Sequence, residues 1–219
     1  MRQSSVPALS YLLRLCPTRS GGTLVWRVAL VDPDTGQVSI VAVFQGVPSP
    51  MPNPHRGEAM ESDPVPTAVA FDQAGNMYVS FLPGIPFLPG AAKVVRVAPD
   101  GTTSDFATGL TMVTDLRTGP DGDLYAVQMG QFTQDGPVPD SGSIIRIKAD
   151  SSSEVVVNGL SFPTSIDFNA AGDAYVTVNG VGAPGTGGVL KFADLTEMAG
   201  TALQVPAALP TESDSGPRG

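Results

Sequence analysis

Three charged side chains are the best candidates for chemistry in this sequence: Asp115, Arg117 and Asp167. They fall on corresponding apolar runs of an internal repeat, so folding would place them on neighbouring strands. Two convergent carboxylates could ligate Ca²⁺, which takes oxygen ligands, and could support hydrolysis. The alternative is an ion pair of Arg117 with a carboxylate of the adjoining strand, and we favour it because a nearby cation weakens a cation site. The sequence therefore predicts a polar cluster without a bound metal, with Ca²⁺ as the alternative.

Other catalytic signatures are missing from the sequence. His55 is the single histidine, and it sits in Asn53-Pro54-His55-Arg56, where we expect a solvated loop. A hydrolytic triad needs a histidine base that a third group orients. No Gly-x-Ser-x-Gly elbow, P-loop or Cys-x-x-Cys motif occurs, and the single cysteine, Cys16, allows no internal disulfide. The sequence therefore names no catalytic residue and leaves enzymatic activity open.

Three segments should be loops between the second and third strands of successive repeat copies, and the first two of them carry large apolar side chains. The loops are expected over residues 82–92, 129–142 and 179–187. The side chains are Ile85, Phe87, Leu88, Phe132 and Val138. Exposed apolar clusters often mark binding sites, so the sequence predicts a loop-face site for an apolar or aromatic small molecule or a protein partner. Alternatively, Phe87 and Leu88 fold down and cap the sheet below.

The repeat itself is carried by a tyrosine that follows three residues behind a glycine. The three copies contain Gly75 and Tyr78, Gly122 and Tyr125, and Gly172 and Tyr175, and they are 47 and 50 residues apart. A period of this length is typical of stacked or radially arranged supersecondary units. We expect the three tyrosines to occupy equivalent second-strand positions with most of each ring buried.

Each copy contains short apolar runs bounded by Gly, Pro, Asp and Asn, which is the pattern of β-strands. Two full copies have four runs, and the last has three and a weak fourth near Thr201–Val205. Residues 22–31 and 36–44 should end an earlier unit, and Gln45–Pro66 should be an irregular connection. The sequence thus predicts an all-β fold, a partial β-propeller of four-stranded antiparallel blades with about three and a half repeats.

The predicted propeller covers residues 21–209, with repeats near 67–110, 111–160 and 161–205. Residues 1–20 are left as an unassigned N-terminal extension, and we expect 210–219 to be a disordered tail. Propellers normally close with four to eight blades. The end blades should therefore leave open faces, which suggests a homodimer that completes the ring or an aggregating fragment.

Composition limits the classes of partner. The formal net charge of −9 argues against nucleic acid, because nonspecific affinity for phosphates comes from Lys and Arg. No run approaches the roughly 18 apolar residues of a membrane-spanning helix. Residues Val6–Cys16 follow Arg2 and are weakly similar to a signal peptide, but Arg14 interrupts them and no clear cleavage site follows.

Several segments between Glu61 and Phe192 resemble the ScyD/ScyE family, which is named for the gene cluster of the pigment scytonemin. They are Leu82–Gly90, Val65–Phe71, Val94–Val97, Phe162–Ile166 and Pro184–Leu190. The resemblance implies a secreted-looking propeller of the six-bladed type, related to NHL-repeat and lactonase-type proteins. It implies an extracytoplasmic, non-catalytic binding or scaffold module with a link to pigment biosynthesis. The alternative is a calcium-dependent, lactonase-like hydrolase that uses Asp115 and Asp167.

Overall fold

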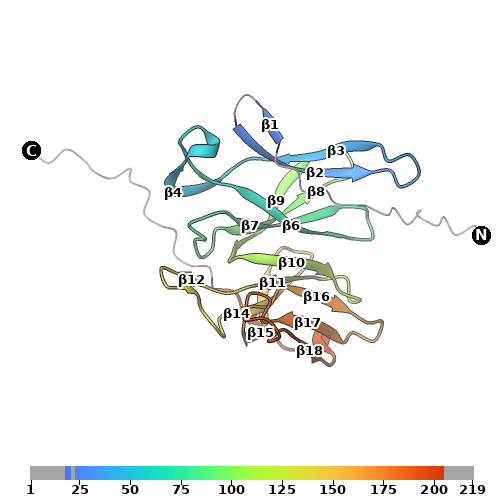
Figure 1. Ribbon diagram of the computed structural model, residues 1–219. Helices are drawn as coiled ribbons and strands as arrows, with labels where there is room; N and C mark the ends of the chain where they lie inside the picture. The colour runs from blue at the N-terminus through green and yellow to red at the C-terminus, as the bar shows by residue number, and fades with distance from the viewer. Residues whose placement is uncertain (1–17, 21–22, 205–219) are drawn as a thin grey trace, which may run out of the picture.

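Four antiparallel sheets stack face to face along the chain (Figure 1). The computed structural model describes residues 18–20 and 23–204. The signal-peptide-like stretch Val6–Cys16, most of the extension over 1–20 and the whole tail over 210–219 lie outside these residues. Three clusters of buried side chains fill the spaces between successive sheets. The predicted all-β, partial-propeller architecture is confirmed.

The first sheet of the stack, here called the N-terminal sheet, contains the two strands expected to end an earlier blade. Its strands are β1 (Thr18–Ser20), β2 (Thr23–Val31) and β3 (Val38–Phe44), in that order. Val28, Ala42 and Phe44 are buried in the cluster that joins this sheet to the next one. The N-terminal sheet is therefore an integral layer of the stack.

The segment expected to be an irregular connection forms a β-hairpin, so that expectation is wrong. Strands β4 (Val47–Asn53) and β5 (Ala59–Ser62) pair with each other, and the short 3₁₀ helix η1 (Pro54–Arg56) lies in the turn. Prolines stand at every second position of β4, namely Pro48, Pro50 and Pro52. All three missing N–H groups therefore belong to one edge of the strand, which a two-stranded sheet tolerates.

The first blade is a four-stranded meander, as predicted. It consists of β6 (Pro64–Phe71), β7 (Met77–Pro83), β8 (Ala92–Val97) and β9 (Thr103–Leu110), hydrogen-bonded in chain order. Strand β6 lies at the inner edge and packs beside the first strand of the next blade, β10.

The last described strand follows the third blade in sequence but belongs to the sheet of the second blade, which the sequence did not suggest. The second blade contains β10 (Val113–Thr118), β11 (Leu124–Gln128), β14 (Gly142–Ile147) and β15 (Ser153–Leu160). The third contains β16 (Ser165–Phe168), β17 (Ala174–Val178) and β18 (Gly188–Phe192). Strand β19 (Thr201–Ala202) pairs with β15 and not with β18. The expectation of a fourth strand in the third blade near Thr201–Val205 is therefore wrong.

Arg146 explains why β19 joins the second blade. Its two terminal nitrogens donate to the carbonyl oxygens of Thr196 and Met198, at 2.8 and 3.0 Å. These residues belong to the segment around the 3₁₀ helix η2 (Leu195–Glu197), which follows β18. Leu195 is fully buried among side chains of both blades. Together these contacts turn the chain back towards the outer edge of β15.

The strand register confirms that the three repeat tyrosines are equivalent. Each lies opposite the aligned residue of the inner strand and opposite a basic residue of the third strand, Arg96, Arg146 or Lys191. The exposed fractions are 7% for Tyr78, 0% for Tyr125 and 39% for Tyr175. The expected burial is thus confirmed for the first two tyrosines and wrong for Tyr175, because no described sheet covers its face of the third blade.

Candidate functional site

Two of the residues predicted to form a loop-face binding site lie in loops of different blades that contact each other. The loop after β7 carries Phe87, and the loop after β11 carries Phe132. Their ring centroids are 5.1 Å apart with the planes tilted by 56°, a separation typical of favourable aromatic pairs. The structure therefore joins two aromatic residues that are distant in the sequence.

Phe132 is presented by a small hairpin that the sequence analysis did not identify. Strands β12 (Phe132–Thr133) and β13 (Gly136–Pro137) pair across Gln134 and Asp135. The Asp-Gly dipeptide at its end was the available signal, since Asp and Gly favour tight hairpin turns. Ser141 closes the hairpin, because its Oγ donates to the Val138 carbonyl and accepts from the Gln131 N–H.

The two loops are also connected by a hydrogen-bonded chain beneath them. The Gly90 N–H donates to Thr111 Oγ1 at 3.0 Å, and the Thr111 N–H donates to Gln128 Oε1 at 2.5 Å. Gln128 is buried, and its Nε2 donates to Ser143 Oγ at 2.8 Å. A buried, satisfied polar network holds its members in one arrangement. Thr111 and Gln128 thus support the loop face, and no sequence motif identified them.

Exposure differs among the five predicted loop-face residues. Ile85 is 73% exposed and Phe132 is 38% exposed. Phe87, Leu88 and Val138 are half-buried. The loop face therefore combines partly packed rings with one fully presented aliphatic side chain, which is a geometry suited to an apolar contact.

Asp115 of the predicted channel cluster is buried and bonded to the next blade. Its Oδ2 accepts from Ser165 Oγ at 2.7 Å and from the Ile166 N–H at 3.0 Å, and its Oδ1 accepts from the Leu116 N–H at 2.9 Å. Oδ2 thus holds the inner strands β10 and β16 together, and Oδ1 is engaged by the backbone of its own strand β10.

Arg117 and Asp167 are both exposed. Arg117 Nε donates to the Ile166 carbonyl at 3.3 Å, and Asp167 Oδ1 accepts from the neighbouring Phe168 N–H. In the part of the chain that the structure describes, Arg117 makes no ion pair with either aspartate. The expected Asp–Arg ion pair is therefore wrong, because Asp115 is satisfied by the next blade instead.

Threonines of the first two inner strands share one role. Thr67 Oγ1 donates to the Val113 carbonyl at 2.9 Å, and Thr114 Oγ1 donates to the Pro163 carbonyl at 3.3 Å. Each bond thus links one blade to the next at the same position. The aligned Thr164 instead pairs with Thr177 of its own blade, and we assign the three threonines no chemical role.

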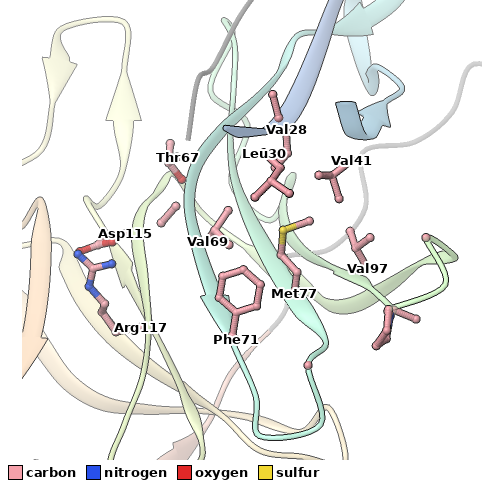
Figure 2. A pocket seen from close by; sticks show the side chains of 16 residues that line it. Val28, Leu30, Val41, Thr67, Val69, Phe71, Met77, Val97, Asp115 and Arg117 are labelled. Carbon is pink, nitrogen blue, oxygen red and sulfur yellow. The ribbon is translucent and has the colours of Figure 1, made fainter. Parts of the chain in front are cut away.

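A cavity of about 500 Å³ lies between the N-terminal sheet and the first blade (Figure 2). Val28, Leu30 and Met77 are among its apolar lining residues, and it extends past the inner strand β6 to Asp115 and Arg117. In Figure 2 these two charged residues stand on the other side of β6 from the apolar group. The cavity was not predicted from the sequence, because it depends on how two separate sheets pack.

The remaining candidates do not form a reactive site. His55 is exposed within η1, and its backbone N–H donates to Asn53 Oδ1 at 3.0 Å. Among residues 18–20 and 23–204, no three His, Cys, Asp or Glu side chains are grouped closely enough to hold a metal ion. None of the helices found in those same ranges has the length and hydropathy of a membrane span.

Comparisons with solved structures agree with this fold. TolB from Acinetobacter baumannii superposes with a TM-score of 0.50 and 15% identity, over 86% of this chain and 42% of the TolB chain. A gluconolactonase from Xanthomonas campestris gives 0.49 and 16%, over 82% of this chain and 58% of its own. The chain thus spans less than two thirds of either neighbour, and the TolB likeness establishes the propeller fold. No protein-family model matches the sequence, and no curated protein matches it either.

Proposed function

We propose that this protein is a non-catalytic binding module whose loop face takes an apolar, aromatic small molecule. The supporting observation is the contact between Phe87 and Phe132, which two loops of different blades bring to 5.1 Å. Exposed aromatic and aliphatic side chains on a supported loop offer stacking and desolvation without any reactive group. An exposed apolar segment of a protein partner is the second possible ligand for the same chemistry.

The test is binding of Nile red, a neutral aromatic dye whose fluorescence rises in apolar surroundings. We expect Phe132→Ser to weaken binding about fivefold, because the loss of one aromatic contact costs on the order of 1 kcal/mol. Met60→Ser is the matched control, since Met60 is 54% exposed on the separate β4–β5 hairpin. Equal dye affinity of the parent chain and Phe132→Ser would exclude the loop face as the site.

We also propose that the module acts without a bound metal. The oxygens of Asp115 already accept three hydrogen bonds, and the Arg117 cation lies two residues along the same strand. Purified protein should therefore hold no stoichiometric calcium or zinc by elemental analysis. Finding one ion per chain that is lost in Asp167→Ala would overturn this proposal and favour a calcium-dependent, lactonase-like hydrolase.

The resemblance to the ScyD/ScyE family supports an extracytoplasmic location and a link to pigment or other secondary-metabolite biosynthesis. Planar aromatic metabolites have the chemistry that the loop face suits. Cell fractionation tests the location directly, and recovery of the protein in the cytoplasmic fraction alone would contradict it.

A further inference from the structure

The outer face of the third blade carries residues that are buried in the other two blades. This face consists of Tyr175, Thr177, Val189 and Lys191, with Ser165 and Asp167 of β16 beside them, because cross-strand partners and alternate residues share one side of a sheet. Tyr175 is 39% exposed and Val189 is 64% exposed. The register makes Val94 and Ile144 the equivalents of Val189, and both are 0% exposed.

The two inner interfaces show what covers such a face. Tyr125 and Ile144 of the second blade pack against the third blade, where Phe168 lies 4.8 Å from the Tyr125 ring. Tyr78 and Val94 of the first blade pack in the same way against the second blade. In both cases the cover is the apolar face of another antiparallel sheet. The outer face of the third blade is therefore built to receive a sheet.

Among the sheets that the structure describes, the N-terminal sheet presents a face of the matching kind. Ala42 and Phe44 of β3 are buried against the first blade, so Val43 between them faces away. A register shift at Val41 keeps Ile40 and Val38 on this same outward side. Val38, Ile40 and Val43 are 54%, 50% and 47% exposed. We call these three residues the outer face of the N-terminal sheet.

These two faces cannot meet within one copy, because the N-terminal sheet and the third blade lie at opposite ends of the stack (Figure 1). We propose that the outer face of the third blade docks on the outer face of the N-terminal sheet of a second copy. Two copies then close into a ring through two identical, heterologous contacts. The proposal is independent of the loop-face function, since it uses different residues.

Sedimentation velocity and light scattering of the full chain at micromolar concentration test this proposal. The parent chain should have twice its single-chain mass of 22.5 kDa. Val189→Glu and Ile40→Glu should each halve that mass, because each buries a charge in both contacts of the ring. Met60→Glu is the matched control, since Met60 is 54% exposed on the separate β4–β5 hairpin, and it should remain dimeric.

Mixing the two interface variants separates a heterologous contact from a self-pairing one. Each variant retains one intact face, so a mixture should form a dimer through a single contact. We expect this at about 100-fold higher concentration than the parent chain needs, because one contact lacks the avidity of two. Circular dichroism and emission of the single tryptophan, Trp26, verify that the variants are folded.

A monomeric parent chain, dimers that persist in both charged variants, or a mixture that stays monomeric at the higher concentration would each overturn the proposal. Parent assemblies that grow beyond the dimer would show an open, non-closing contact, and would equally overturn the closed ring.

Discussion

Replacing Tyr125 by Ala is expected to lower the free energy of unfolding by about 4 kcal/mol, the range for buried aromatic side chains. The ring is fully buried and lies 4.8 Å from Phe168 of the next blade. Its hydroxyl donates to Asp121 Oδ2 at 2.7 Å. Burial, followed by this bond, raises the pKa of Tyr125, so the hydroxyl stays protonated at neutral pH. Chemical denaturation measures the loss.

Two matched variants separate packing from hydrogen bonding. Tyr125→Phe removes the hydroxyl alone and should cost about 1 kcal/mol. Tyr175→Ala changes the equivalent residue of the third blade, which is 39% exposed in the single chain. In the monomeric Val189→Glu background it should cost less than about 1 kcal/mol. Equal losses in Tyr125→Ala and Tyr175→Ala would contradict the difference in burial between the two blades.

Asp115→Ala is the second substitution with a large expected effect, about 3 kcal/mol of unfolding free energy. The carboxylate accepts from Ser165, Ile166 and Leu116, and the two bonds to β16 cross between blades. Removing it leaves buried donors without partners, and hydrogen bonds to charged groups contribute more than neutral ones. Thermal or urea unfolding gives the measurement.

Asp167→Ala is the control for this prediction. Asp167 is exposed, and its carboxylate bonds to the backbone N–H of the following residue. We expect a change below about 0.5 kcal/mol, as for surface substitutions. A large loss in Asp167→Ala with a small one in Asp115→Ala would reverse the structural roles assigned to the two aspartates.

The architecture was predictable because the turn residues and the apolar runs recur together, at the same positions of each repeat copy. Gly75 and Gly122 adopt the positive φ angles that tight turns require, and the apolar runs between such turns have the period of strands. The β4–β5 hairpin was not predictable in this way. Its prolines oppose a strand assignment until one sees that they share a single free edge.

Long-range relations explain the remaining differences. No nearby residue type indicates that Thr201 and Ala202 form a strand of the second blade. They pair with β15 because contacts of Arg146 and Leu195 bring this segment to its outer edge. Likewise, the loop-face residues could be named from their types, but the meeting of Phe87 with Phe132 depends on the angle between two blades. The cavity depends on sheet packing in the same way.

Strands β15 and β19 are neighbours in the sheet of the second blade, but the entire third blade lies between them in the amino-acid sequence. On the ribosome, the second blade must therefore wait with its outer edge unpaired until all of β16 to β18 and η2 have been synthesised. A protease cut within the third blade would likewise leave β19 attached to the second, so the two blades would not separate into independent fragments. The last described strand, β19, thus completes a sheet whose other strands all precede the third blade in the sequence.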